Sequence, residues 1–192
     1  MKETYSWRRE GYTLRTARAE DAERYYTENF NPLDPEVARM TGCKPSFTRR
    51  EVTEFFLACV GDETRFDFLL IAPDGRVVGE SIVNEIDRET RSANFRICIF
   101  SFAARGQGLG LWMVRTTRDF AFEQLGLHRL SLDVFSFNFR AAAVYEKAGF
   151  RREGVLRDAV RDGAAYGDDI LMAMLETEWR EQKALESKNP TV

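Results

Sequence analysis

The spacing of hydrophobic and polar positions changes halfway along the chain. In the first half, short apolar or alternating runs at 66–72, 76–86 and 94–100 are separated by polar turns, which predicts an antiparallel meander of strands. In the second half, strand-like runs alternate with runs of helical period. A strand–helix–strand order brings two strands side by side in parallel. The pattern therefore predicts an α/β (α+β) fold with one mixed, twisted sheet.

Capping and turn residues locate the remaining elements. Thr48-Arg49-Arg50-Glu51 has the form of a capping box, and the helix that it starts ends near Gly61. Asp162-Gly163 predicts a hairpin turn between the last two strands. No linker divides the chain, so we expect one domain over residues 1–180 and a polar helical tail at 181–192, without order from Ser187 onward. The other expected elements are helices at 19–29, 108–125 and 141–148 and strands at 12–15 and 129–135.

The composition excludes several classes of protein. Lys and Arg number 28 against 31 Asp and Glu, a net charge of −3, so the chain lacks the basic surface that binds duplex nucleic acid. The longest apolar runs, such as 68–72, are far shorter than the ~20 residues of a membrane-spanning helix. One histidine, His128, is too few for a His-ligated metal site, and three separated cysteines form no disulfide framework. These features predict a cytoplasmic domain without a metal, membrane or nucleic-acid partner.

The segment with the clearest chemistry is the glycine-rich loop at 105–110, which follows the central strand and precedes a helix. Glycines let the backbone approach a ligand closely, and the free N–H groups at a helix N-terminus favour an anion such as pyrophosphate. The loop is not a Walker A motif, because no Gly-Lys-Ser/Thr follows, and it lacks the G-x-G-x-x-G of a Rossmann fold. A tight strand-to-helix turn would explain the same glycines.

Two motifs resemble those of the GNAT superfamily of acyl-CoA-dependent N-acetyltransferases. Residues 105–110 satisfy the superfamily loop Q/R-x-x-G-x-G/A, and Asn138 and Tyr145 lie in a segment of the form N-x(6)-Y-x-K-x-G-F. The resemblance covers roughly residues 76–179. It implies a GNAT-like sheet whose parallel pair diverges around acetyl-CoA. Glu153-Gly154 and the segment after Asp162 are similar to the branch that contains ribosomal-protein N-terminal and spermidine acetyltransferases.

The resemblance also implies a role for each motif residue. The loop N–H groups would hold the pyrophosphate, the central strand would pair with the pantetheine amides, and the Asn138 amide would bind the pantetheine arm or only cap its helix. Arg140 and Lys147 would bind the 3′-phosphate or remain solvated helix charges. The cofactor-binding residues implied in this way are Cys98, Ile99, Phe100, Arg105, Gly106, Gln107, Gly108, Leu109, Gly110, Asn138, Arg140 and Lys147.

The same resemblance implies the catalytic groups. Tyr145 would be the general acid that protonates the leaving CoA thiolate, since a phenol stays protonated at pH 7. Glu85 occupies a position where the spermidine-acetylating relatives also carry a glutamate, and it would act as the base or hold a cationic amine. Glu80 lies on the same strand with an odd separation, which predicts that it faces the other side of the sheet. Glu85, Glu80 and water all remain open as the base.

The expected function is acetyl transfer from acetyl-CoA to a primary amine by direct attack. The first acceptor class is a protein N-terminus of the ribosomal-protein type, and the alternatives are a polyamine, another small amine, or a non-catalytic acyl-CoA-binding module. The sequence leaves the length of the acyl group open. Edge strands around 155–160 and 170–175 predict a homodimer.

Overall fold

The computed structural model describes residues 3–188, which form one sheet with helices on both faces. The strands are β1 (Ser6–Arg9), β2 (Tyr12–Thr16), β3 (Phe66–Ile71), β4 (Val77–Asp87), β5 (Ser92–Ile99), β6 (Arg129–Phe135), β7 (Arg151–Asp162) and β8 (Ala165–Leu175). The helices are α1 (Ala22–Asn29), α2 (Pro35–Thr41), α3 (Arg49–Gly61), α4 (Leu109–Glu123), α5 (Phe139–Lys147) and α6 (Glu176–Lys188), with 3-10 turns η1 (Ala19–Asp21) and η2 (Phe102–Ala104).

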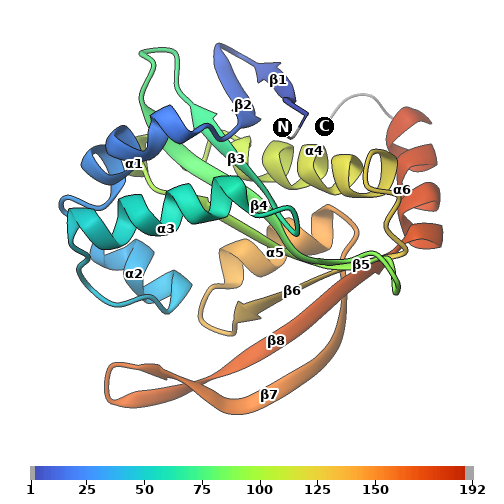
Figure 1. The fold of residues 1–192 in the computed structure, drawn as a ribbon. Coiled ribbons are helices and arrows are strands. Elements are labelled where there is room, and N and C mark those ends of the chain that lie inside the picture. Colours follow the sequence, from blue (N-terminus) through green and yellow to red (C-terminus); the bar gives the residue numbers. More distant parts are fainter. Residues whose placement is uncertain (1–2, 189–192) are drawn as a thin grey trace.

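The sheet confirms the predicted mixed topology. Its strand order is β1-β2-β3-β4-β5-β6-β8-β7, and every neighbouring pair is antiparallel except β5 and β6. Helices α1, α2 and α3 cover one face of the meander, whereas α4 and α5 pack on the opposite face (Figure 1). The meander and the single α/β domain are therefore as the sequence predicts.

Two short elements were not expected from the sequence. Helix α2 begins in a stretch for which no element was expected. The Asp34 side chain accepts a hydrogen bond from the Glu36 N–H at 2.8 Å, and Pro35 occupies the first turn. Gly42 ends the helix with φ of +68°. Strand β1 pairs with β2 from Ser6 opposite Arg15 to Arg9 opposite Tyr12. Both elements have too few residues to show a periodicity.

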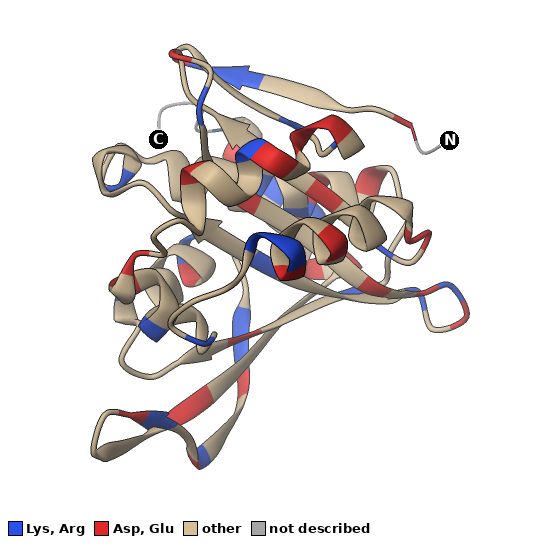
Figure 2. Ribbon diagram, turned by 60° about the vertical axis from the view of Figure 1, so that its left-hand side comes forward, with Lys and Arg blue, Asp and Glu red and all other residues tan. Residues whose placement is uncertain are grey.

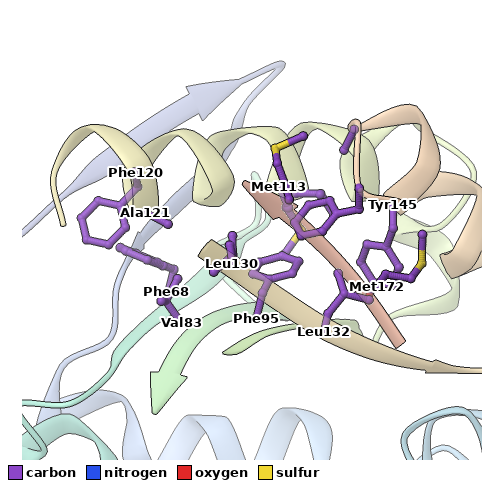
Figure 3. Packing of buried hydrophobic residues seen from close by; sticks show 14 of the residues in the cluster. Phe68, Val83, Phe95, Met113, Phe120, Ala121, Leu130, Leu132, Tyr145 and Met172 are labelled. Atoms are coloured by element: carbon purple, nitrogen blue, oxygen red, sulfur yellow. The ribbon is translucent and has the colours of Figure 1, made fainter. Parts of the chain in front are cut away.

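A large hydrophobic core joins α4 and α5 to the sheet (Figure 3). Phe68 and Phe120 contact edge to face, with ring centroids 5.0 Å apart. Phe95 stands on β5 in the same core and contacts the Tyr145 ring edge to face at 6.2 Å. A smaller core under α1–α3 contains Tyr25, and the two cores fix the faces to which the β4 and β5 side chains point.

The C-terminal helix crosses the expected domain boundary at residue 180. Helix α6 runs through residue 180, and its side chains bind α4: Glu186 accepts from the fully buried Arg118 at 2.9 Å, and Lys183 pairs with Asp119. Residues 181–188 are thus a packed helix that continues the domain, because they cover a charged group of the core. Ser187 and Lys188 belong to this helix, and 189–192 lie outside the described residues.

Basic and acidic residues are interspersed along the chain. In the ribbon of Figure 2, Lys and Arg positions lie among Asp and Glu positions on the helices and strands. Within residues 3–188, no helix has both the length and the apolar character needed to cross a membrane.

Candidate active site

The parallel strands β5 and β6 separate soon after they meet. Their ladder covers only Ser92, Ala93 and Asn94 of β5, so the rest of that edge has no strand partner. The Phe100 N–H donates to the Val78 carbonyl of β4 at 2.9 Å. Because successive amides of a strand point to opposite sides, the Ile99 amide faces the opening and those of Cys98 and Phe100 face β4. Of Cys98, Ile99 and Phe100, the three residues expected to bind pantetheine, Ile99 therefore has the backbone amide that can pair with an added extended segment.

The loop at 105–110 has the geometry of an anion site. Gly106 and Gly108 have φ of +76° and +74°, which L side chains rarely adopt. Gly108 is the N-cap of α4 and supplies no side-chain cap, so the first N–H groups of this helix are free of side-chain acceptors. A Cβ added at Gly106 would meet no atom within 4 Å. This open N-terminus of a 15-residue helix fits a diphosphate.

Arg105, the first loop residue, is held by acidic side chains of α2 and its N-cap. Its guanidinium binds the Glu36 carboxylate at 2.5 Å and the Asp34 carboxylate at 3.4 Å, both at the N-terminus of α2. Its Nε also donates to the Ile99 carbonyl at 3.2 Å. Arg105 therefore braces α2 against the end of β5.

The side chains of Gln107 and Leu109, and the absence of one at Gly110, determine how the loop folds and packs. The Gln107 amide donates to the Ala103 carbonyl at 2.5 Å, which closes the loop on itself. The Leu109 side chain is buried in the large core. Gly110 leaves room for Ile99, whose Cδ1 would lie 3.7 Å from an added Cβ. Their contribution to an anion site is limited to the backbone.

Helix α5 carries Asn138 and Tyr145. Asn138 is the N-cap, and its Oδ1 accepts from the Ala141 N–H at 3.3 Å, so the capping role is present. Tyr145 is buried, and this burial raises its pKa well above the usual value near 10. Among residues 3–188, no group makes a hydrogen bond with its hydroxyl. The phenol is therefore a protonated group that can donate.

Glu80 reaches the same end of β5 from the opposite face. It stands across from Cys98 in the β4–β5 ladder and accepts a hydrogen bond from the Tyr25 hydroxyl at 2.5 Å. Burial raises the pKa of Glu80 to about 7, although the hydrogen bond from Tyr25 acts in the opposite direction. A carboxyl group with this pKa exchanges protons readily near neutral pH.

Glu85 does not join these residues. Five positions beyond Glu80, it lies roughly 16 Å further along the strand. It is exposed, has φ of +55°, and sits where β4 bulges between Asn84 and Asp87. Its carboxylate accepts a hydrogen bond from the neighbouring Asn84 amide at 3.3 Å. Of the two glutamates, Glu80 stands across from the end of β5 that has no parallel partner, and Glu85 does not.

Arg140 and Lys147 lie on the outer surface of α5. Arg140 is in the first turn, with its Cζ 6.0 Å from the Phe139 ring, and Lys147 is the last helical residue. Both side chains are exposed and neither has an ion-pair partner among residues 3–188. They are free to meet a phosphate group.

Two residues near the opening gave no signal in the sequence. Tyr25 lies on the helix expected at 19–29, and its hydrogen bond to Glu80 joins positions 55 residues apart. Arg9 comes from the unexpected strand β1 and lies beside Gly108 of the loop. Within residues 3–188, no group of three or more His, Cys, Asp or Glu side chains could hold a metal ion.

Comparisons with known proteins agree with this geometry. Residues 12–151 match the family model described as an acetyltransferase (GNAT) domain. The SPbeta prophage-derived uncharacterized N-acetyltransferase YokL of Bacillus subtilis is 28% identical over 93% of this chain and 97% of its own length. The Probable N-acetyltransferase YjcK of the same organism is 31% identical over 66% of this chain and 70% of its own length.

Relatives named for an acceptor include spermidine N(1)-acetyltransferases and the Putative ribosomal N-acetyltransferase YdaF of Bacillus subtilis, which is 28% identical over 57% of this chain and 60% of its own length. The spermidine N(1)-acetyltransferase of Vibrio cholerae is 27% identical over 67% of this chain and 74% of its own length. The crystal structure of spermidine N-acetyltransferase from Vibrio cholerae in complex with CoA and spermine has the same fold, with a TM-score of 0.79, 24% identity and coverage of 90% of this chain and 99% of that one. The matched domain spans the diverging strands, the glycine loop and Tyr145, and the chain therefore belongs to the GNAT family of N-acetyltransferases.

Proposed function

We propose that this enzyme transfers the acetyl group of acetyl-CoA to the primary amine of a small cationic acceptor, of the polyamine class, by direct attack on the thioester. One observation carries the proposal: Glu80 and Tyr145 approach the opening between β5 and β6 from opposite faces of the sheet. A base on one side and an acid on the other are what amine attack and thiolate departure require.

The cosubstrate fits the residues around the opening. The N–H groups of 106–110 receive the pyrophosphate, and the backbone of Ile99 pairs with the pantetheine arm as an added strand would. Asn138 stands at the entrance of α5 beside that arm, and Arg140 and Lys147 offer their charges to the 3′-phosphate. When bound, acetyl-CoA supplies the activated acetyl group.

The protein residues then move two protons. The Glu80 carboxylate accepts a proton from the acceptor ammonium, and the free amine nitrogen forms a bond to the thioester carbonyl carbon. When the resulting tetrahedral intermediate collapses, the C–S bond breaks and the electron pair leaves with sulfur. Tyr145 donates its hydroxyl proton to that thiolate. The acetylated nitrogen releases its remaining extra proton through water, which reprotonates Tyr145, and Glu80 returns its proton to solvent. The products are an acetylated amine and the CoA thiol.

The surroundings of Glu80 favour a slim acceptor. Helices α1–α3 cover this face of the sheet, and the Tyr25 ring packs against Phe56 and Phe100 with centroids 4.7 Å and 5.9 Å away. An alkylamine enters such a covered face more easily than the N-terminus of a folded protein. The named spermidine-acetylating relatives support the same class.

Three further expectations remain predictions. They are a cytoplasmic location, transfer of acetyl in preference to longer acyl groups, and a homodimer. The outer strand β7 supports the last, because it is an unpaired edge whose Val155 and Leu156 are each 50% exposed.

A panel of acceptors tests the proposed function. Thiol release from acetyl-CoA is followed with spermidine, a short diamine and a peptide with a free N-terminus. We expect kcat/KM to be highest for the two small amines. A higher value for the peptide would move the acceptor class to protein N-termini, and CoA binding without turnover on any amine would leave a non-catalytic acyl-CoA-binding module.

A further inference from the structure

Strand β1 lies outside the segment that matches the GNAT family model, which begins at residue 12. It nevertheless packs on the core of the domain, beside α4 (Figure 1). The Trp7 ring meets Phe120 of α4 edge to face at 6.1 Å and Phe68 of β3 at 5.3 Å. One face of β1 is thus fixed by aromatic packing against the helix that starts at the glycine loop.

Strand alternation places Arg9 on that same inner face. Residues i and i+2 of a strand share a face, so Arg9 follows Trp7 inward and Arg8 points outward. The exposures agree, since Trp7 and Arg9 are half-buried and Arg8 is exposed. The backbone of β1 therefore aims one of two consecutive arginines at the N-terminus of α4.

The β1–β2 hairpin touches the glycine loop at two points. The Arg9 guanidinium lies against Gly108, with Nη2 3.5 Å and Nη1 3.9 Å from the position of an added Cβ. The Tyr12 hydroxyl donates to the Gln107 side-chain oxygen at 3.5 Å. The charge of Arg9 consequently lies beside the free N–H groups at the start of α4.

The loop lacks another cation that is free to act. Arg105, the basic residue inside the loop, is held by Glu36 and Asp34 of α2. Within residues 3–188 Arg9 forms one ion pair, with its exposed neighbour Glu10 at 3.3 Å, and pairs of this kind contribute little free energy. Arg9 can therefore leave its ion pair with Glu10 and bind a phosphate oxygen at little cost in free energy. Arginine binds phosphate through two parallel N–H groups.

We propose that Arg9 binds the pyrophosphate of acetyl-CoA, so that the N-terminal strand outside the family segment forms part of the cosubstrate site. The assignment rests on the proposed function, because it requires the pyrophosphate at 106–110. It adds a charged side chain to a site that otherwise binds through backbone N–H groups. The hairpin then covers the phosphates from the side opposite α2.

Titration calorimetry of CoA with the full chain tests this assignment. Arg9→Gln is compared with Arg8→Gln, a control that removes the same charge from the same strand but from its outer face. We expect the Kd for CoA to rise about tenfold to hundredfold in Arg9→Gln and to change less than about twofold in Arg8→Gln. The difference should shrink as salt is added. Equal Kd values for the two variants would overturn the proposal.

Two truncated ligands locate the contact. Dephospho-CoA keeps the pyrophosphate and lacks the 3′-phosphate, so the loss in Arg9→Gln should persist with it; a loss that vanishes would contradict the assignment. Pantetheine lacks both groups and should bind Arg9→Gln and wild type alike. Arg9→Lys keeps the charge and should recover part of the affinity, which a merely misfolded hairpin would not do. Wild-type protein that binds CoA but acetylates no amine would refute the proposed function and leave the Arg9 assignment intact.

Discussion

Replacement of Glu80 by Gln tests the proposed base most sharply. The substitution keeps the size and shape of the side chain and removes its titration. Tyr25, which donates to the Glu80 carboxylate at 2.5 Å, can donate equally to the amide oxygen of Gln. The variant therefore separates the loss of a proton acceptor from the loss of packing.

The structure gives the size and the sign of the effect of this substitution on the free energy of unfolding. The pKa of Glu80 rises from 4.5 to about 7 because burial disfavours its charge. Each pH unit corresponds to about 1.4 kcal/mol, so the ionised form costs the folded state roughly 3 kcal/mol. The stabilising contribution of the neutral form is complete below about pH 4.5 and is lost as the pH rises through 7. As the pH rises from about 4.5 through 7, the free energy of unfolding of Glu80→Gln should therefore come to exceed that of wild type by up to roughly 3 kcal/mol.

Denaturant unfolding at several pH values measures this difference, and kinetics measure the consequence for catalysis. Below about pH 7 Glu80 must lose its own proton before it can accept one from the acceptor ammonium, so the logarithm of kcat/KM should rise with a slope near one. Above pH 7 the carboxylate and the ammonium are both present, and the profile should level off. Glu80→Gln should follow the slope of one throughout, at roughly 10²–10⁴-fold lower activity.

Two results would refute this reasoning. A change of slope near pH 7 that persists in Glu80→Gln would assign the titration to another group. Wild-type activity in the variant, with an unchanged pH profile, would show that water alone removes the proton.

Three further predictions address neighbouring residues. Glu85→Gln should leave kcat and KM within about twofold of wild type, because the side chain is exposed far from the opening; a drop comparable to that of Glu80→Gln would restore Glu85 as the base. Tyr145→Phe should lower kcat at least about 100-fold while the Kd for acetyl-CoA stays unchanged in calorimetry, and full turnover would exclude it as the acid. Arg118→Met should lower the free energy of unfolding by about 3–5 kcal/mol, because it leaves Glu186 and the Ala148 carbonyl without their buried partner. A loss below about 1 kcal/mol would contradict this role of the guanidinium.

Local patterns predicted the parts of the fold that depend on neighbouring residues. The meander and the strand–helix–strand unit follow from apolar spacing, and the capping box at Thr48 and Glu51 starts α3 where expected. The loop at 105–110 was recognisable because its glycines are needed for positive φ and for a free helix N-terminus. These features are encoded within a few consecutive residues.

The missing parts of the site depend on contacts between distant segments. The odd separation of Glu80 and Glu85 predicts opposite faces of one strand, but the cover of α1 over Glu80 and the bulge beside Glu85 are set by distant segments. Arg105 matches the loop motif, yet its partners Asp34 and Glu36 come from a helix 70 positions away that was not predicted. Arg9 required the packing of β1 on α4 before it could be placed. Such pairings have no signature in a single sequence.

Mass spectrometry of the products tests the central claim most directly. Wild-type protein, Glu80→Gln and Tyr145→Phe are each incubated with acetyl-CoA and spermidine, and acetylated spermidine and CoA thiol are quantified together. We predict one acetyl group on a primary amine for every CoA thiol released by the wild type, and strongly reduced formation of both in the two variants. Protein that binds CoA but leaves spermidine and every other small amine unmodified would contradict the account.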